Sequence, residues 1–226
     1  MLRVLPCTDT VGRRQLLAGG NEPGLDSSDR GDGGPLGKQP VEHLRVQVMK
    51  PCAAYGAGME PCRPLVLVDV DGVLNPARSH APGYRGHWVF PAGVAHRLWL
   101  NPSHGPMLTE LAEAADAELV WATYWRNGAN TWVGPRVGLP SLGFVPIPRR
   151  WRSHTRAPMG IWKACHVAAW VGQRPFVWFE DDADAVARLA EQPGLERHLV
   201  VKVDPVIGLT GSHVEQARAW LDDLRR

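Results

Sequence analysis

Four short apolar runs, each followed by polar residues, constrain the fold of this chain more than any other feature. The first is Pro64-Leu65-Val66-Leu67-Val68-Asp69, and the others lie at residues 118–123, 175–179 and 199–203. Continuous runs rich in Val and Leu indicate strands buried on both faces of a parallel sheet. Segments with helical spacing separate the runs. We therefore predict an α/β fold with a doubly wound, Rossmann-like parallel sheet.

The segments between the runs predict the remaining elements. A hairpin is expected from residues 86–90 and 96–100 around the turn at 91–93. A first helix is expected near Pro106, capped by Ser103 or His104. Further helices are expected at 163–171 and 184–190, and a last one is expected to open with a capping box at Ser212–Glu215. Residues 124–160 predict loops with short elements.

The first sixty residues differ in composition from the rest. They are rich in Gly, Pro, Asp and Ser and have little apolar periodicity, so residues 1–60 predict a disordered tail before a domain at 61–226. Arg13-Arg14 resembles a twin-arginine export signal but lacks the apolar stretch that such a signal needs. Met49 and Met59 are alternative starts for a shorter reading frame.

Composition excludes several classes of protein. No apolar run approaches the roughly 18 residues that a membrane helix needs. The four cysteines form no CxxC pair and have no histidines at zinc spacing, which predicts neither a disulfide framework nor structural zinc. A reducing, cytoplasmic compartment is therefore expected. The formal net charge of +2 does not by itself indicate a nucleic-acid partner.

Polar residues follow three of the predicted strands. In doubly wound sheets, ligands bind beyond the carboxyl ends of the strands. Asp69 and Asp71, Thr123 and the acids of 180–182 stand at those ends, and Lys163 opens the helix before the third strand. Oxygen ligands without His or Cys favour Mg²⁺, and a metal beside a lysine suits a phosphate. An aspartate can attack phosphorus, and a second acid can protonate the leaving alcohol.

The same residues resemble a known family. Asp69-Val70-Asp71-Gly72-Val73-Leu74-Asn75 after an apolar strand looks like the first motif of the haloacid dehalogenase (HAD) superfamily. Thr123, Lys163 and Glu180-Asp181 resemble its second, third and fourth motifs, in the family's order. More narrowly, residues 119–125, Asn130 and residues 203–210 are similar to the HAD-like domain of Swiss-Army-Knife RNA-repair proteins. That resemblance implies phosphatase chemistry on RNA ends.

The resemblance also implies a role for each residue. Asp69 would be the nucleophile and a Mg²⁺ ligand. Asp71 would be the general acid/base and would offer its backbone carbonyl to the metal. Thr123 and Lys163 would hold phosphoryl oxygens, and Glu180 or Asp181 would complete the metal site. A common fourth motif has two adjacent Asp after the strand, whereas here Glu180 stands first, so the choice among the acids of 180–182 stays open.

Charge and access bear on the substrate. No acidic residue lies between Glu118 and Glu180, and Arg149-Arg150-Trp151-Arg152 mixes positive charge with an aromatic ring. This composition suits a nucleic-acid-binding loop, or a solvated loop that offsets the acids. The interval from Asn75 to Pro106 holds no more than a small flap, so no large cap domain is expected. An open site favours a large substrate.

These observations predict an enzyme, a Mg²⁺-dependent HAD-type phosphatase that acts through an aspartyl-phosphate. Its expected partner is a phosphorylated substrate, which the basic loop and the open site suggest is a nucleic-acid end, and no membrane partner is expected. Two alternatives remain open: a small-metabolite phosphatase of the same chemistry, and a non-catalytic nucleic-acid-binding module with the same fold.

Overall fold

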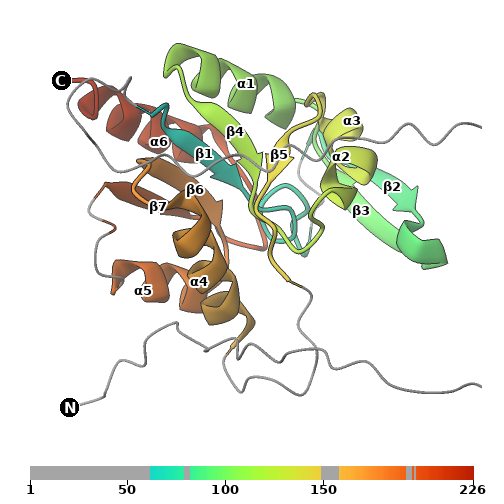
Figure 1. Ribbon diagram of the computed structural model, residues 1–226. Coiled ribbons are helices and arrows are strands. Elements are labelled where there is room, and N and C mark those ends of the chain that lie inside the picture. Colours follow the sequence, from blue (N-terminus) through green and yellow to red (C-terminus); the bar gives the residue numbers. More distant parts are fainter. Residues whose placement is uncertain (1–61, 79–81, 149–157, 192–194, 196) are drawn as a thin grey trace, which may run out of the picture. The chain divides into compact units, whose positions relative to one another are not determined.

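A five-stranded parallel sheet forms the centre of the part that the structure describes. The structure is a computed structural model that describes residues 62–78, 82–148, 158–191, 195 and 197–226. The strands are β1 (Leu65–Val68), β4 (Glu118–Trp121), β5 (Gly143–Phe144), β6 (Phe176–Glu180) and β7 (His198–Lys202). Their order is β5-β4-β1-β6-β7 with every neighbouring pair parallel, so β1 lies in the middle (Figure 1). The predicted doubly wound sheet is confirmed.

Helices cover both faces of this sheet (Figure 1). Helices α1 (His104–Ala114) and α6 (Gly211–Asp223) pack on one face, and α4 (Met159–Val171) and α5 (Ala183–Ala190) pack on the other. Alternate residues of β1 point to opposite faces of the sheet. Val66 and Val68 pack in the core under α1 and α6, whereas Leu65 and Leu67 pack in the core under α4 and α5. All four are fully buried, which is why the strand is continuously apolar.

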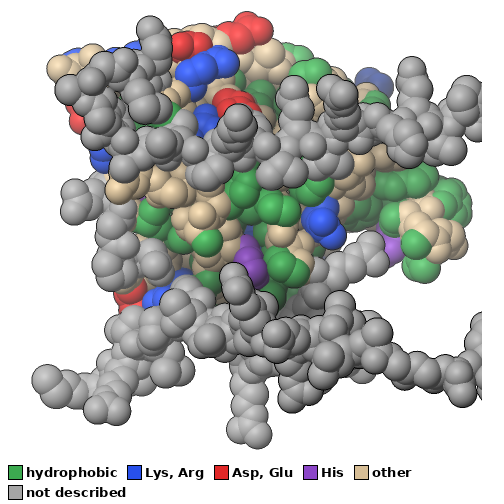
Figure 2. All heavy atoms as spheres, in the orientation of Figure 1, with side chains coloured by type: hydrophobic (Ala, Val, Ile, Leu, Met, Phe, Trp, Pro, Cys, Tyr) green, Lys and Arg blue, Asp and Glu red, His purple; other side chains and the backbone are tan. Residues whose placement is uncertain are grey.

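A hairpin is inserted between β1 and α1. Strands β2 (Arg85–Val89) and β3 (His96–Leu100) pair antiparallel around a 3₁₀ turn at Pro91–Gly93, as predicted. Trp88, Phe90 and Val94 near its tip are 60%, 54% and 58% exposed. Figure 2 shows hydrophobic side chains gathered over this hairpin at the right of the view. Two short helices, α2 (Gly128–Trp132) and α3 (Gly134–Val137), precede β5.

Two helix boundaries and one strand differ from the sequence-based expectations. Helix α4 begins at Met159, directly after Pro158, and not at Lys163. Helix α6 is capped by Thr210, whose backbone and hydroxyl both reach His213 Nδ1, and not by a box at Ser212–Glu215. Strand β5 was not predicted, because its two residues form no apolar run and it is defined only by pairing with β4.

The expectation of no disulfides is wrong for the described residues. Cys62 and Cys165 are both disulfide-bonded. Spacing along the chain detects zinc ligands, but it does not detect cysteines that only the fold brings to a partner. The expectation of a reducing compartment rested on that prediction and loses its support.

The remaining expectations concern a membrane and the N-terminal segment. Among the helices in the described part of the chain, none combines the length and the apolar character that a bilayer crossing requires. The expected tail at 1–60 lies outside the described residues.

Candidate active site

The loop after β1 carries the first two acids. Asp69 follows the strand directly, and the chain then turns back on itself, with the amides of Leu74 and Asn75 both donating to the carbonyl of Val70. Gly72 has a φ of +80° in this turn, and a Cβ there would lie 2.2 Å from the carboxylate of Asp181. A side chain at this position would therefore meet both backbone strain and the acid cluster.

Lys163 joins the acids of two neighbouring strands. Helix α4 places the ammonium group of Lys163 against the Asp69 carboxylate and 2.6 Å from Glu180 Oε2. All three side chains are buried, and Glu180 is fully so. Burial alone would lower the pKa of Lys163, but the charges of Asp69 and Glu180 raise that pKa above its ordinary value. The lysine is therefore a permanent cation, shared by two carboxylates.

Three carboxylates meet at this point. Oxygens of Asp69, Glu180 and Asp181 lie within 4.8 Å of one another. Burial, together with the charge of Asp69, raises the pKa of Glu180 to about 8 and also raises the pKa of Asp181. Burial is also the main cause that raises the pKa of Asp69. When all three carboxylates are ionised, one lysine leaves the cluster with excess negative charge, which a divalent cation would neutralise.

Asp182 has a different task from the two acids before it. Its carboxylate caps helix α5 by accepting from the amides of Asp184 at 2.9 Å and Ala185 at 3.3 Å. Its own amide donates to Glu180 Oε1 at 3.0 Å. Of the acids at 180–182, the structure therefore brings Glu180 and Asp181 to Asp69 and directs Asp182 to the helix N-terminus.

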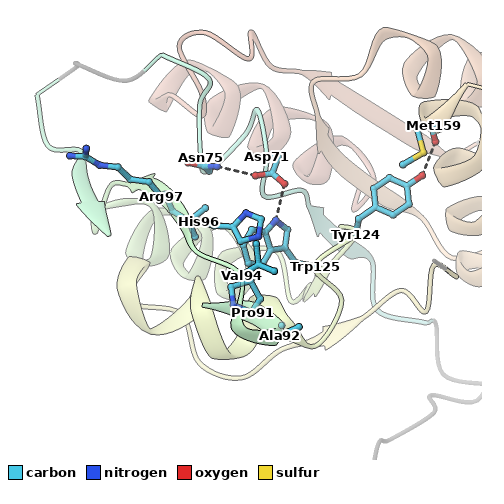
Figure 3. A pocket seen from close by; sticks show the side chains of 12 residues that line it. Asp71, Asn75, Pro91, Ala92, Val94, His96, Arg97, Tyr124, Trp125 and Met159 are labelled. Carbon is cyan, nitrogen blue, oxygen red and sulfur yellow. Dashed lines mark hydrogen bonds between the residues drawn. The ribbon is translucent and has the colours of Figure 1, made fainter. Parts of the chain in front are cut away.

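Thr123 and Asp71 complete the predicted set. Thr123 is buried two residues after β4, and its hydroxyl oxygen accepts from the amide of Trp125 at 3.3 Å. Asp71 is exposed, and it is not one of the three acids whose oxygens lie within 4.8 Å of one another, although its charge contributes to the raised pKa of Asp69. Its oxygens accept from Trp125 Nε1 at 2.8 Å and from Asn75 Nδ2 at 2.9 Å (Figure 3).

A pocket of about 910 Å³ opens beside Asp71 (Figure 3). Its walls come from the turn after β1, from six hairpin residues between Pro91 and Leu98, and from the segment after β4. Tyr124 closes one side by donating its hydroxyl hydrogen to the carbonyl of Met159 at 2.8 Å. Of the predicted catalytic residues, Asp71 alone lines this space, whereas Asp69, Thr123 and Lys163 are buried.

Sequence reasoning missed two residues of this site. Asn75 was part of the first motif but had no role, and Trp125 was only one of several tryptophans near the site. Both contact Asp71. Trp125 lies 54 positions from Asp71, so no local pattern indicates that contact, whereas Asn75 lies only four positions from Asp71, within the same motif. The predicted basic loop, Arg149, Arg150, Trp151 and Arg152, lies outside the described residues.

Comparison with known families identifies the family of this chain. The model for the HAD domain in Swiss Army Knife RNA repair proteins matches residues 65–214, from β1 into α6. The chain belongs to this family. The match includes the four motif positions and the hairpin of this HAD domain. No curated protein matches the chain.

Proposed function

We propose that this HAD domain hydrolyses phosphate monoesters through a covalent phosphoaspartate at Asp69. The observation that carries the proposal is the placement of Asp69 at the end of the central strand, held by Lys163 and grouped with Glu180 and Asp181 within 4.8 Å. Asp71, the next acid along the chain, faces an open pocket that has room for the alcohol part of an ester.

The donor set fits Mg²⁺. The cluster offers carboxylate oxygens alone, the ligand type that this cation prefers, and its negative charge exceeds what Lys163 balances. Asp69 and Asp181 would hold the ion together with the backbone carbonyl of Asp71, while Glu180 is mainly the partner of Lys163. Bound there, Mg²⁺ would neutralise phosphoryl oxygens and orient the ester for attack.

The reaction would proceed in two balanced steps. In the first, an oxygen of Asp69 bonds to phosphorus, and the bond from phosphorus to the ester oxygen breaks with its electron pair. Asp71 gives a proton to the departing alcohol. In the second, water bonds to phosphorus and yields a proton to Asp71. The bond between Asp69 and phosphorus then breaks, which releases phosphate and restores the carboxylate. Lys163 and the Thr123 hydroxyl would hold phosphoryl oxygens throughout.

A nucleic-acid end is the substrate that the surroundings favour. The family is described by its occurrence in RNA repair proteins. The hairpin between Arg85 and Leu100 contains no acidic residue and presents aromatic and basic side chains beside the pocket. A polyanion with stacking bases suits such a surface. Hydrolysis of phosphorylated oligonucleotides should therefore slow steeply with salt, whereas hydrolysis of a small ester should change little.

The direct test is hydrolysis of 4-nitrophenyl phosphate with Mg²⁺ and with EDTA. We expect turnover with Mg²⁺ and its loss in EDTA, followed by recovery when Mg²⁺ is restored. Phosphate release from oligonucleotides with a 5′- or a 3′-phosphate then identifies the substrate end. A rate that EDTA leaves unchanged would contradict the metal-dependent mechanism. Oligonucleotide binding without turnover of any ester would favour the binding-module alternative.

The pH dependence of thermal stability should reveal the raised pKa of Glu180 in the acid cluster without any measurement of catalysis. The pKa of Glu180 is raised from 4.5 to about 8, so the folded state holds a proton there that the unfolded state has lost between those pH values. Stability of the metal-free protein should therefore fall as pH rises from 6.5 to 8.5. His104, whose pKa burial lowers from 6.5 to about 4, is neutral in the folded state throughout this range. In the unfolded state it is half protonated at pH 6.5, so it makes a small contribution of opposite sign at the lower end of the range only.

The measurement is Tm by calorimetry at pH 6.5 and 8.5, with EDTA or saturating Mg²⁺. We expect Mg²⁺ to raise Tm more at pH 8.5, because the ion binds the deprotonated carboxylates. Glu180→Gln serves as the matched variant and should flatten the pH dependence in EDTA. A Mg²⁺ effect equal at both pH values would show that the ion binds away from these carboxylates.

A further inference from the structure

Both oxygens of the Asp71 carboxylate are held by nitrogen donors. Trp125 Nε1 donates to Oδ2 at 2.8 Å, and Asn75 Nδ2 donates to Oδ1 at 2.9 Å (Figure 3). Asp71 is exposed and lines the pocket, where a free carboxylate would sample several rotamers. Two donors that approach different oxygens fix both the direction and the plane of the group. Each oxygen keeps a second lone pair for a proton or for the substrate.

Trp125 is itself held by two further contacts. Its amide donates to the Thr123 hydroxyl at 3.3 Å, and its ring packs edge-on against His96 of the hairpin, with centroids 5.9 Å apart. The turn from Thr123 continues into Arg126, which has a φ of +51°, a left-handed conformation that costs a non-glycine residue energy. The strained residue therefore lies in the same turn that directs the indole N–H of Trp125 toward Asp71.

Asn75 links Asp71 to the hairpin. Its Oδ1 accepts from the amide of Trp99 on β3 at 2.8 Å, while its Nδ2 donates to Asp71. A backbone amide can only donate, so the carbonyl end of the Asn75 side chain must face Trp99 and its amino end must face Asp71. An amide is the side chain that can do both. A carboxylate in this place would repel Asp71.

We propose that Trp125 and Asn75 are positioning residues that hold Asp71 toward the pocket, in the orientation needed to protonate the leaving alcohol. The proposal rests on the proposed phosphatase function. It adds that the general acid is aimed from two sides: by the Thr123 turn through Trp125, and by the hairpin through Asn75. A displacement of the hairpin would therefore reach Asp71 through Trp99 and Asn75, whereas the buried group of Asp69, Lys163 and Glu180 has its own contacts.

Dependence on the leaving group tests this role. A general acid matters for an alkyl phosphate, whose alcohol is a poor leaving group, and much less for 4-nitrophenyl phosphate, whose phenolate departs without a proton. Trp125→Phe keeps the ring and removes the N–H. We expect it to slow alkyl ester hydrolysis roughly tenfold or more, part of the 10²–10⁴-fold range of general acid catalysis, and to slow aryl ester hydrolysis less than about threefold.

Three further variants complete the comparison. Asp71→Asn removes the general acid altogether, so it should show the largest difference between the loss of alkyl ester hydrolysis and the loss of aryl ester hydrolysis. Asn75→Asp should show the same selective loss as Trp125→Phe. Trp132→Phe changes another partly buried tryptophan that lies on α2, and it should leave both rates unchanged. If Trp125→Phe and Asn75→Asp slow hydrolysis of the two esters equally, the positioning role is overturned. The phosphatase function still stands in that case, provided that the wild-type protein hydrolyses the esters. A wild type that hydrolyses neither ester would overturn both.

The hydrogen bond can also be observed without turnover. In a ¹H–¹⁵N spectrum of the full chain, Trp125→Phe identifies the indole resonance of Trp125 by its disappearance. We expect that resonance to move upfield in Asp71→Ala, because the indole N–H loses a charged acceptor. An unmoved resonance would overturn the proposed contact, whatever the rates show.

Discussion

Asp69→Asn is expected to remove turnover of every phosphate ester, with a loss of about 10³-fold or more. An amide cannot attack phosphorus, and the covalent intermediate cannot form. The fold should persist, because Asn has nearly the same shape and Lys163 keeps Glu180 as a partner, 2.6 Å away. Removing one of the clustered carboxylates also relieves repulsion within the group. Tm in EDTA should therefore stay level or rise.

The experiment compares initial rates and Tm for wild type, Asp69→Asn and Asp223→Asn. Asp223 is exposed at the end of α6, so it supplies the same chemical change away from the site. Mass spectrometry of acid-quenched protein should detect phosphorylation in the wild type during turnover and none in Asp69→Asn. Wild-type rates in Asp69→Asn would show that another residue is the nucleophile.

Lys163→Met is expected to give the largest loss of stability among single changes at the site. It leaves Asp69 and Glu180 buried without a cation, and breaking a buried ion pair from one side costs about 3–5 kcal/mol. For a domain of this size the loss corresponds to a fall in Tm of roughly 6–20 °C. Under the proposed mechanism, turnover should be lost as well, because Lys163 would no longer hold the phosphoryl oxygens.

Lys202→Met is the matched control. Lys202 ends β7 and is exposed, so this change should shift Tm little. Adding Glu180→Gln to Lys163→Met removes one stranded charge and should recover part of the lost Tm without restoring activity. Equal Tm values for Lys163→Met and Lys202→Met would mean that the buried ion pairs do not stabilise the fold.

The sequence was sufficient for the scaffold of the site. Continuous apolar runs identify strands that are buried on both faces. Asp69 directly follows β1, and Thr123 lies two residues after β4. Glu180 was expected just after its strand, and it is in fact the last residue of β6, paired in register with Lys202. Lys163 was expected in the first turn of a helix. It lies further inside α4, because that helix begins at Met159.

The finer features depend on contacts that no local pattern encodes. The three acids at 180–182 make different contacts because α5 begins at Ala183 and takes Asp182 as its N-cap, a role that the sequence pattern did not predict. Trp125 contacts Asp71 across 54 positions and Asn75 contacts Trp99 across 24, so only the tertiary structure brings these partners together. The two-residue strand β5 depends on its neighbour β4 in the same way.

The strand order determines at which point during synthesis the residues of the candidate active site are all present. Thr123 follows the strand on one side of β1, Glu180 ends the strand on the other side, and Lys163 arrives from the helix between them in sequence. During synthesis, a chain that stops before β6 carries Asp69 and Lys163 but lacks the second carboxylate that shares the lysine. Enzymatic activity would therefore mark the moment at which both halves of the sheet have closed around β1.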